Sequence, residues 1–150
     1  MSAPRSKEDQ LRRLLVELQI LQNTAEVLQS RLNVLESAMA ELRVAGTTLR
    51  ELGKEEEGAP LLIPVGGGSF IKARLGDISK VIVGIGADVS VEMELEKALE
   101  DIGARLSEME KASRSIQQQL SQIVAQIRDH QESVNRLSQE LRGEGASGVQ

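Results

Sequence analysis

Apolar residues recur at alternating spacings of three and four along two long stretches of this chain. The first stretch contains Leu11, Leu14, Leu18, Leu21, Ala25, Leu28, Leu32, Leu35, Met39, Leu42 and Leu49. The second contains Leu95, Leu99, Ile102, Leu106, Met109, Ser113, Ile116, Leu120, Ile123, Ile127, His130, Val134, Leu137 and Leu141, of which Ser113 and His130 are polar. A seven-residue repeat of this length keeps one narrow face of a helix toward a partner helix, so it predicts a left-handed coiled coil. We call these residues the seam.

The composition argues against several classes of protein. The chain of 150 residues has one Phe, no Trp and no Tyr, so it lacks the aromatic side chains of a large globular core. Its net charge of -5 predicts neither a nucleic-acid partner nor a membrane partner. It has no cysteine, which excludes disulfides, cysteine-based zinc sites and thiol catalysis. With no apolar run of about 18 residues, we expect a soluble, cytoplasmic protein.

Capping signals set the expected helix boundaries. Ser6 and Asp9 have the spacing of an amino-terminal capping pair, which predicts a first helix from near Lys7 to Gly53. Before the second helix, Ser90 is a cap candidate, and Glu92 and Glu94 supply the negative charge that a helix start favours. The predicted division is a helix in residues 1–53, a linker with strands in residues 54–91, a helix in residues 92–142 and a flexible tail in residues 143–150.

Between the helices the apolar period changes to two, and glycines recur at short intervals. Four short strands are expected, at residues 61–65, 69–75, 80–85 and 87–91, with turns at residues 66–68, 76–77 and 86–88. Pro64 cannot donate a hydrogen bond to a neighbouring strand, so its strand should be an edge strand or carry a bulge. The expected fold class is α+β: a long antiparallel two-helix coiled coil joined by a four-stranded segment of two hairpins.

A segment this small cannot bury both faces of a sheet, and its open edges invite pairing with another chain. We therefore expect the strands to be an oligomerisation platform. The residues predicted to serve it are Ile63, Val65, Phe70, Ile71, Ala73, Leu75, Val81, Val83, Ile85 and Val89. If the helices pair outward from this platform, Leu14 should lie near His130 and Leu11 near Val134.

No group of residues predicts a catalytic, metal or cofactor site. Residues 83–89 begin like a dinucleotide-binding motif, but Val89 stands at the position of its third glycine. His130 is the only histidine, and a polar residue that sets the register of the seam is a better interpretation than a proton carrier. The carboxylate pairs at Glu55 and Glu57 and at Glu92 and Glu94 have the pattern of solvated helix ends.

The first helix also carries apolar residues that its seam does not need. They are Leu15, Val16, Ile20, Val27 and Val34, of which the last three are spaced seven apart. This exposed stripe predicts either a surface offered to another molecule or packing against a further helix in a bundle, and the pattern favours neither.

The strand region resembles that of the archaeal prefoldin alpha-subunit family. The resemblance is carried by residues 62–73 (LIPVGGGSFIKA), by Asp77 and by residues 80–87 (KVIVGIGA), and seam helices of matching length extend it over nearly the whole chain. It implies a hexamer of two alpha and four beta subunits, in which this chain meets prefoldin beta subunits and a second alpha subunit. The strands of all subunits would form a double β-barrel body that carries six coiled-coil tentacles.

The resemblance also implies a chaperone that uses no ATP, captures unfolded client proteins and transfers them to a group II chaperonin. It implies no catalytic residues. The expected client-binding residues lie at the free ends of the helices: Leu11, Leu14, Leu15, Val16, Ile20, Val134, Leu137 and Leu141. Many weak, non-directional apolar contacts suit clients without a fixed shape.

Two other functions are compatible with parts of the pattern. A structural or tethering coiled-coil oligomer would bind the helices of folded partners. A nucleotide-binding enzyme would use the glycine-rich turns, and for this chain we expect no nucleotide binding.

Overall fold

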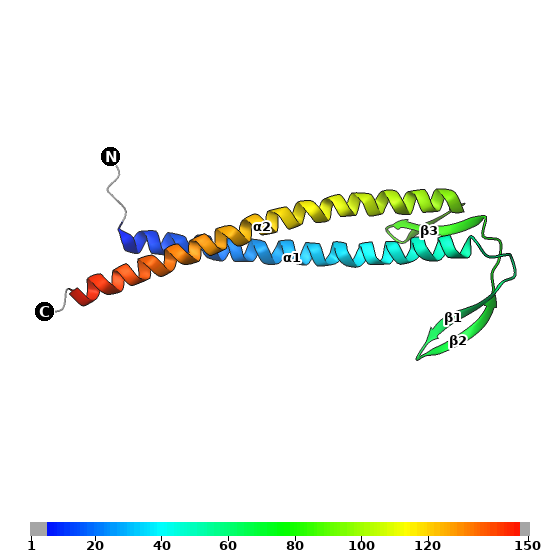
Figure 1. Ribbon diagram of the computed structural model, residues 1–150, viewed down its shortest axis with the longest axis horizontal. Coiled ribbons are helices and arrows are strands. Elements are labelled where there is room, and N and C mark those ends of the chain that lie inside the picture. Colours follow the sequence, from blue (N-terminus) through cyan, green and yellow to red (C-terminus); the bar gives the residue numbers. More distant parts are fainter. Residues whose placement is uncertain (1–5, 148–150) are drawn as a thin grey trace. The chain divides into compact units, whose positions relative to one another are not determined.

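The computed structural model describes residues 6–147 of the chain, and the side chains of residues 6–145. Its elements, in order, are α1 (Lys7–Leu52), β1 (Pro60–Gly66), β2 (Ser69–Arg74), β3 (Lys80–Gly86), β4 (Val89–Glu94) and α2 (Leu95–Ser147) (Figure 1). The chain divides into two compact units. We call the part up to Leu35 and from Ala112 onward the terminal unit, and Glu36–Lys111 the central unit.

The predicted start of the first helix is confirmed at Lys7. The Ser6 hydroxyl oxygen accepts a hydrogen bond from the backbone N–H of Asp9 at 3.2 Å, and the Ser6 carbonyl accepts one from the N–H of Gln10. Glu8 and Asp9 place negative charge on the first turn, which the helix dipole favours. At the other end, the N–H of Gly53 bonds to the carbonyl of Leu49 and the helix stops.

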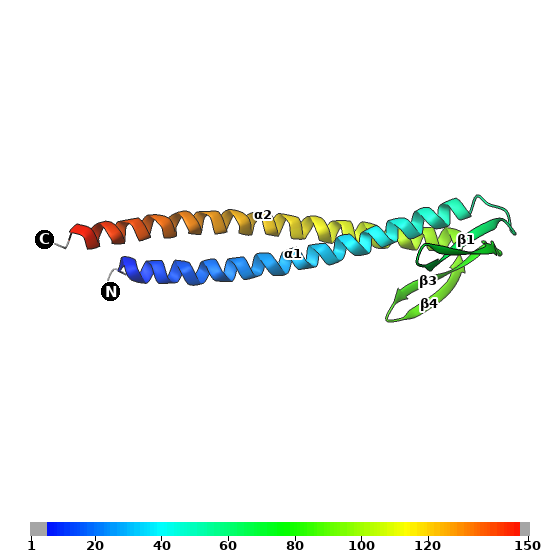
Figure 2. The same cartoon turned by 90° about the horizontal axis from the view of Figure 1, so that it is seen from below.

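The predicted seam is confirmed in both units. Every seam residue of both stretches is buried or half-buried, whereas most other residues of the two helices are exposed. In the terminal unit the α1 and α2 segments lie side by side in two perpendicular views (Figures 1 and 2). Leu28 and Leu32 of α1 are buried there together with Ser113 of α2. The α+β fold class, with two long helices joined by two antiparallel hairpins, is likewise confirmed.

Small residues bring the helices close in the central unit, which the seam pattern did not predict. Ala98 is fully buried, with 0% of its surface exposed. Gly46 is also buried, and a Cβ atom there would lie 3.5 Å from a methyl carbon of Ile102. Ile102 itself is buried in the seam. Because Gly46 has no side chain and Ala98 has only a methyl group, Ile102 packs directly against the helix backbone.

The first hairpin pairs β1 with β2, with Ile63 opposite Ile71 and Pro64 opposite Phe70. β1 is an edge strand of a two-stranded sheet, as one of the two alternatives for Pro64 expected, and the pairing also shifts between Pro64 and Gly66. The turn that follows has positive φ at each of Gly66, Gly67 and Gly68, a conformation that glycine adopts without steric cost.

The second hairpin corrects the predicted start of the second helix. Its turn residues Ala87 and Asp88 both have positive φ, so β4 begins at Val89 and not at residue 87. The ladder then continues through Val83 opposite Val91 as far as Glu94. Ser90 and Glu92 therefore belong to a strand and are not the helix cap, because the period-two alternation of Val89, Val91 and Met93 extends the pairing. The helix begins at Leu95.

The end of the second helix also differs from the prediction. The helix does not stop at Gly143 but continues to Ser147, so residues 143–147 of the expected flexible tail are helical. Lys7 of α1 forms ion pairs with Glu140 and Glu144 of α2, and these tie the last turns to the neighbouring helix. The remainder of the predicted tail, residues 148–150, lies outside the described residues. No helix within residues 6–147 combines the length and apolar character needed to cross a membrane.

We expect Ile102→Ala to lower the free energy of unfolding by about 2–4 kcal/mol, because it leaves a cavity among Gly46, Ala98 and the opposing helix. Denaturant unfolding of the full chain, followed by circular dichroism, measures this change. The control is Val44→Ala on the same unit, where the side chain is exposed and the change should stay within about 0.5 kcal/mol. Equal effects of the two substitutions would contradict the assigned packing.

Candidate interaction surfaces

Exposed apolar side chains form the only candidate functional features among the residues that the structure describes. These residues include no group of three or more His, Cys, Asp or Glu that could hold a metal ion. The large exposed apolar side chains lie on the two hairpins and along helices α1 and α2. Exposed apolar surface gathered in this way marks contact with other molecules, so the site is built from these surfaces.

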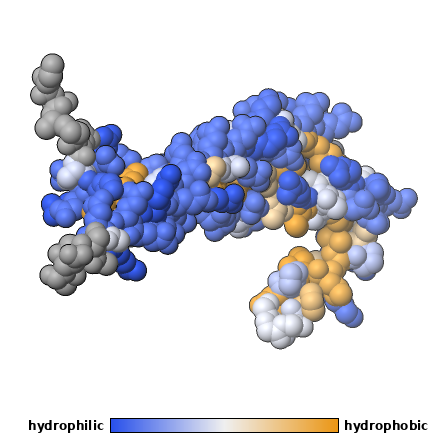
Figure 3. All heavy atoms as spheres, turned by 60° about the vertical axis from the view of Figure 1, so that its left-hand side comes forward, coloured by the Kyte–Doolittle hydropathy of each residue, from blue (hydrophilic) through white to orange (hydrophobic). Residues whose placement is uncertain are grey.

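The first hairpin exposes apolar side chains on both faces. Ile63 and Ile71 are cross-strand neighbours on one face, and Pro64 and Phe70 are neighbours on the other. All four residues are exposed, and Phe70 keeps 58% of its surface accessible. The hairpin projects away from the helix segments of the central unit (Figure 1) and forms an apolar protrusion in the space-filling view (Figure 3). A two-stranded sheet with no support on either face requires a partner to bury it.

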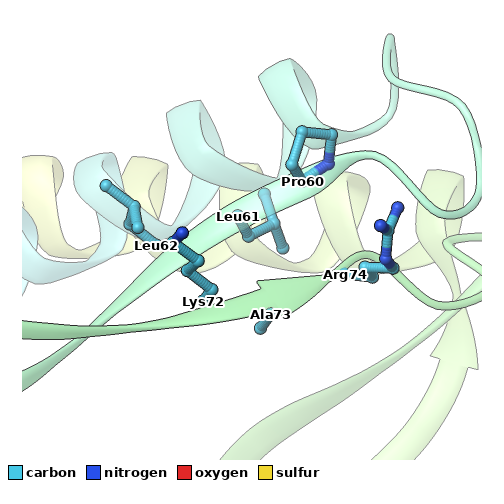
Figure 4. A pocket seen from close by; sticks show the side chains of 6 residues that line it. All are labelled: Pro60, Leu61, Leu62, Lys72, Ala73 and Arg74. Atoms are coloured by element: carbon cyan, nitrogen blue, oxygen red, sulfur yellow. The ribbon is translucent and has the colours of Figure 1, made fainter.

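A hollow at the base of this hairpin belongs to the same surface. Its lining comes from both strands: Pro60, Leu61, Leu62, Lys72, Ala73 and Arg74 (Figure 4). The Arg74 guanidinium donates a hydrogen bond to the Gly58 carbonyl at 3.2 Å, so it holds the connector that precedes β1. The lining is mainly apolar apart from the cationic side chains of Lys72 and Arg74.

The second hairpin, in contrast, is docked on the helices of the central unit. Val83 of β3 is buried, with 7% of its surface exposed. The Arg105 guanidinium of α2 donates a hydrogen bond of 2.6 Å to the carbonyl of Gly84, next to the bulge of β3. Beside this contact the hollow between strand and helices is lined by Leu42, Leu49, Ile102 and others. The outer side of the hairpin still exposes Ile82, at 76% of its surface.

The ten residues predicted for the platform are therefore divided by the structure. The exposed ones are Ile63, Val65, Phe70, Ile71, Ile85 and Val89, whereas Ala73 and Val81 are half-buried, and Leu75 and Val83 are buried. Leu75 follows β2, and its backbone bonds to Gly58 and Ala59 turn it inward. Leu75 and Val83 are covered by other parts of the same chain.

Sequence reasoning missed three exposed residues of the hairpins, namely Leu62, Ile82 and Val91. The predicted set took the alternating residues Ile63 and Val65 of β1 and Val81, Val83 and Ile85 of β3, and it left out the residues between them. A sheet of only two strands has no second layer, so both faces remain available. The signal for Leu62 was present in the unbroken apolar run Leu61–Val65.

The eight predicted client-binding residues fall into two groups in the terminal unit. Leu15, Val16 and Ile20 are exposed, and Val16 keeps 61% of its surface accessible. The half-buried members are Leu11, Leu14, Val134, Leu137 and Leu141, which face the opposite helix in the seam. The exposed stripe continues through Val27 and Val34. Within residues 6–147 no further helix covers it.

A polar contact crosses the seam of the terminal unit at His130. Its Nε2 atom lies 3.0 Å from a Glu17 carboxylate oxygen, and its Nδ1 atom lies 2.9 Å from the Gln126 carbonyl oxygen. The Arg13 guanidinium donates to the other oxygen of Glu17 at 2.8 Å. The predicted register, with Leu14 near His130, agrees with this contact within one helical turn.

These contacts shift the ionisation of both side chains. The hydrogen bond with Glu17, followed by that with the Gln126 carbonyl, raises the pKa of His130 above its ordinary value. The hydrogen bond from Arg13, followed by that from His130, lowers the pKa of Glu17. In the central unit, the backbone N–H of Ser79 lowers the pKa of Asp77 by bonding to its carboxylate at 2.9 Å, which stabilises the turn before β3.

Comparisons with known proteins agree on one family. The family model described as "Prefoldin subunit" matches residues 21–140. A prefoldin subunit alpha of Methanothrix thermoacetophila is 36% identical over 69% of this chain and 68% of its own length. One from Thermococcus onnurineus is 33% identical over 68% of this chain and 70% of its own length. A chain of the cryo-EM structure of filamentous PFD from Methanocaldococcus jannaschii superposes with a TM-score of 0.64 at 27% identity, covering 75% of this chain and 93% of that chain.

We expect Arg105→Ala to release the second hairpin from the helices. Hydrogen exchange of the β3 and β4 amides should accelerate roughly three- to tenfold, because one hydrogen bond of about 1 kcal/mol is lost, while β1 and β2 remain unchanged. Mass spectrometry of exchanged peptides measures this. Arg43→Ala is the matched control, because Arg43 pairs with Glu110 of the opposite helix. Unchanged exchange in β3 and β4 would contradict a docking role for Arg105.

Proposed function

Because the chain belongs to the prefoldin family, we propose that it is a subunit of a cytoplasmic, ATP-independent chaperone that captures unfolded proteins and delivers them to a group II chaperonin. The observation that carries this proposal is the exposure of Leu15, Val16 and Ile20 beside a seam that does not use them. Their contacts would be made at the ends of the helices and shared among several subunits.

The subunits that share these contacts would be joined through their hairpins. We propose a hexamer in which two copies of this chain, as alpha subunits, join four beta subunits. The support comes from the first hairpin, whose residues Ile63 and Phe70 are exposed on opposite faces, and from the alpha subunits among the related proteins. Exposed strand edges add backbone donors and acceptors that a neighbouring strand would satisfy.

Client capture follows from the number of arms and the kind of contact. A single exposed Val or Ile binds weakly, but several arms on one body raise the effective concentration of the next contact. Apolar contacts have no directional requirement, so one surface accepts many unfolded sequences. The half-buried candidates, such as Leu11 and Leu137, would join only if the helix ends separate. Release to a chaperonin remains possible because each contact is weak.

The same geometry gives little support to enzyme or nucleotide functions. The glycines of the nucleotide-like motifs occupy hairpin turns, where Gly66, Gly67, Gly68 and Gly86 have positive φ. Their conformation accounts for their presence without a bound phosphate. We propose no catalytic residue, no cofactor, no nucleic-acid partner and no membrane partner for this chain.

One observation favours a second candidate function, that of a structural or tethering coiled-coil oligomer. Ile20, Val27 and Val34 are all exposed and lie seven residues apart on α1. This spacing fits a folded helix lying along α1 as well as it fits an unfolded client. The two functions differ in which part of the stripe they need, and the following substitutions separate them.

We expect Val16→Ser combined with Ile20→Ser to reduce protection of a denatured protein by roughly twofold or more, because two apolar contacts are lost from each arm. Light scattering of a diluted denatured protein, with the assembled complex and no nucleotide, measures this. Val27→Ser combined with Val34→Ser is the matched control and should change protection little. Equal loss of protection in the two variants would contradict client binding at the helix ends, and no protection by the complex with the unaltered chain would favour the tethering function instead.

We expect Phe70→Asp to abolish hetero-oligomer formation, because a carboxylate would enter an apolar contact between subunits. Native mass spectrometry after mixing with a beta-type prefoldin subunit measures the outcome. Val44→Asp places the same charge on an exposed position of α1 in the central unit and should leave assembly intact. A hexamer of normal mass from the Phe70 variant would refute assembly through the first hairpin.

A further inference from the structure

His130 is a polar residue in an otherwise apolar part of the seam, and each of its two ring nitrogens lies within hydrogen-bonding distance of an oxygen atom. Its Nδ1 atom faces the Gln126 carbonyl oxygen at 2.9 Å and its Nε2 atom faces the Glu17 carboxylate at 3.0 Å. The imidazole is mostly covered, with 23% of its side chain exposed. Within α2 its seam neighbours are Ile127 and Val134, so the polar contact lies between apolar layers.

The two acceptors distinguish the two protonation states of the ring. A neutral imidazole has one N–H, so it can donate to the Gln126 carbonyl or to the Glu17 carboxylate but not to both. Whichever bond it makes, its bare nitrogen then faces an oxygen lone pair. The imidazolium has two N–H groups and satisfies both oxygens at once. The arrangement is therefore complementary to the protonated ring.

The charged groups around the ring favour the same state. Glu17 faces it from α1, and Asp129 adds a second negative charge from α2. Arg13 holds the Glu17 carboxylate from its other oxygen, which keeps Glu17 ionised and orients it toward the ring. Glu17 lies one residue from Val16, and His130 lies one turn from Val134. The contact thus adjoins residues of both groups proposed for client binding.

We propose that His130, Glu17 and Arg13 form a proton-controlled latch that ties the two helices together beside the client-binding residues when His130 is protonated and loosens when it is neutral. The consequence for clients depends on the proposed function. In the closed state the half-buried apolar residues on either side stay in the seam. In the loosened state the helix ends separate more readily, and these residues become accessible to an unfolded chain.

The pH window follows from the direction of each shift. Because the pKa of His130 is raised by folding, its stabilisation is fully present below the ordinary histidine pKa of 6.5 and is lost as the pH rises through the raised value. Because the pKa of Glu17 is lowered, its stabilisation is lost only when the pH falls through that lowered value. The latch is therefore closed in mildly acidic solution and loosens on the alkaline side.

The latch itself is tested without a client. Because the chain contains a single histidine, one imidazole signal in the NMR spectrum of the labelled full chain reports the titration of His130 directly. We expect the midpoint to move to lower pH in the Glu17→Gln variant and to stay in place in the Glu26→Gln variant, which removes a carboxylate elsewhere on α1. A midpoint that does not respond to Glu17→Gln overturns the latch.

Helix separation provides the second measurement. The chain has no cysteine, so spin labels can be placed at Arg12→Cys and Gln131→Cys alone, on exposed positions of the two helices. We expect a narrow distance distribution at pH 5.5 and a broader one at pH 8.5. The His130→Leu variant restores an apolar seam residue and should give one distribution at both pH values. Equal broadening in this variant, or none in the parent, overturns the latch.

The final experiment measures protection of a denatured protein by the assembled complex at both pH values. We expect protection to be roughly two- to fivefold greater at pH 8.5 for the unaltered chain, as is typical of one partly exposed ion pair, and equal at both pH values for His130→Leu. A pH-independent parent whose spin-label distance still broadens overturns the link between latch and clients. Absence of protection at both pH values overturns the proposed function, while the distance measurement still decides the latch.

Discussion

Packing of α1 against α2 through a narrow seam is the interaction on which the other features depend. Neither helix has an aromatic core residue to pack against, and the seam supplies most of the buried apolar surface: Leu28, Leu32, Met39 and Ile102 are among the few deeply buried residues of the chain. Such a seam buries one stripe of each helix and leaves the remaining surface to solvent. For this reason the exposed stripe of Val16 and Ile20 is a surplus and requires a separate explanation.

The two hairpins differ in how the apolar faces of their two-stranded sheets are covered. The second hairpin gains support from the chain itself, through buried Val83 and the hydrogen bond from Arg105. The first has no such support and keeps Ile63 and Phe70 exposed on opposite faces. This asymmetry gives the central unit one hairpin of defined position and one surface that only another subunit can bury, which is the form of an assembly element.

The seam contains two polar interruptions, and their surroundings differ. Ser113 is buried among apolar residues, and its small side chain fills a seam position without a charge. His130 is partly covered and has a carboxylate partner on the opposite helix. A neutral hydroxyl responds little to pH, whereas an imidazole changes its donor count over the range where it titrates. Of these two residues, therefore, only His130 makes the packing of the seam depend on pH.

Apolar periodicity determined the fold class, the strands and the burial of every seam residue, and the Ser6–Asp9 capping pair determined the helix start at Lys7, because each depends on spacing over a few residues. The tertiary structure alone decided the rest. Glu17 meets His130 across more than a hundred residues of sequence, Lys7 pairs with Glu140 in the last turns of α2, and Arg105 donates a hydrogen bond to the carbonyl of Gly84 in β3. These contacts join residues that are distant in the chain, and no repeat records which distant side chains come within hydrogen-bonding distance once the helices have paired.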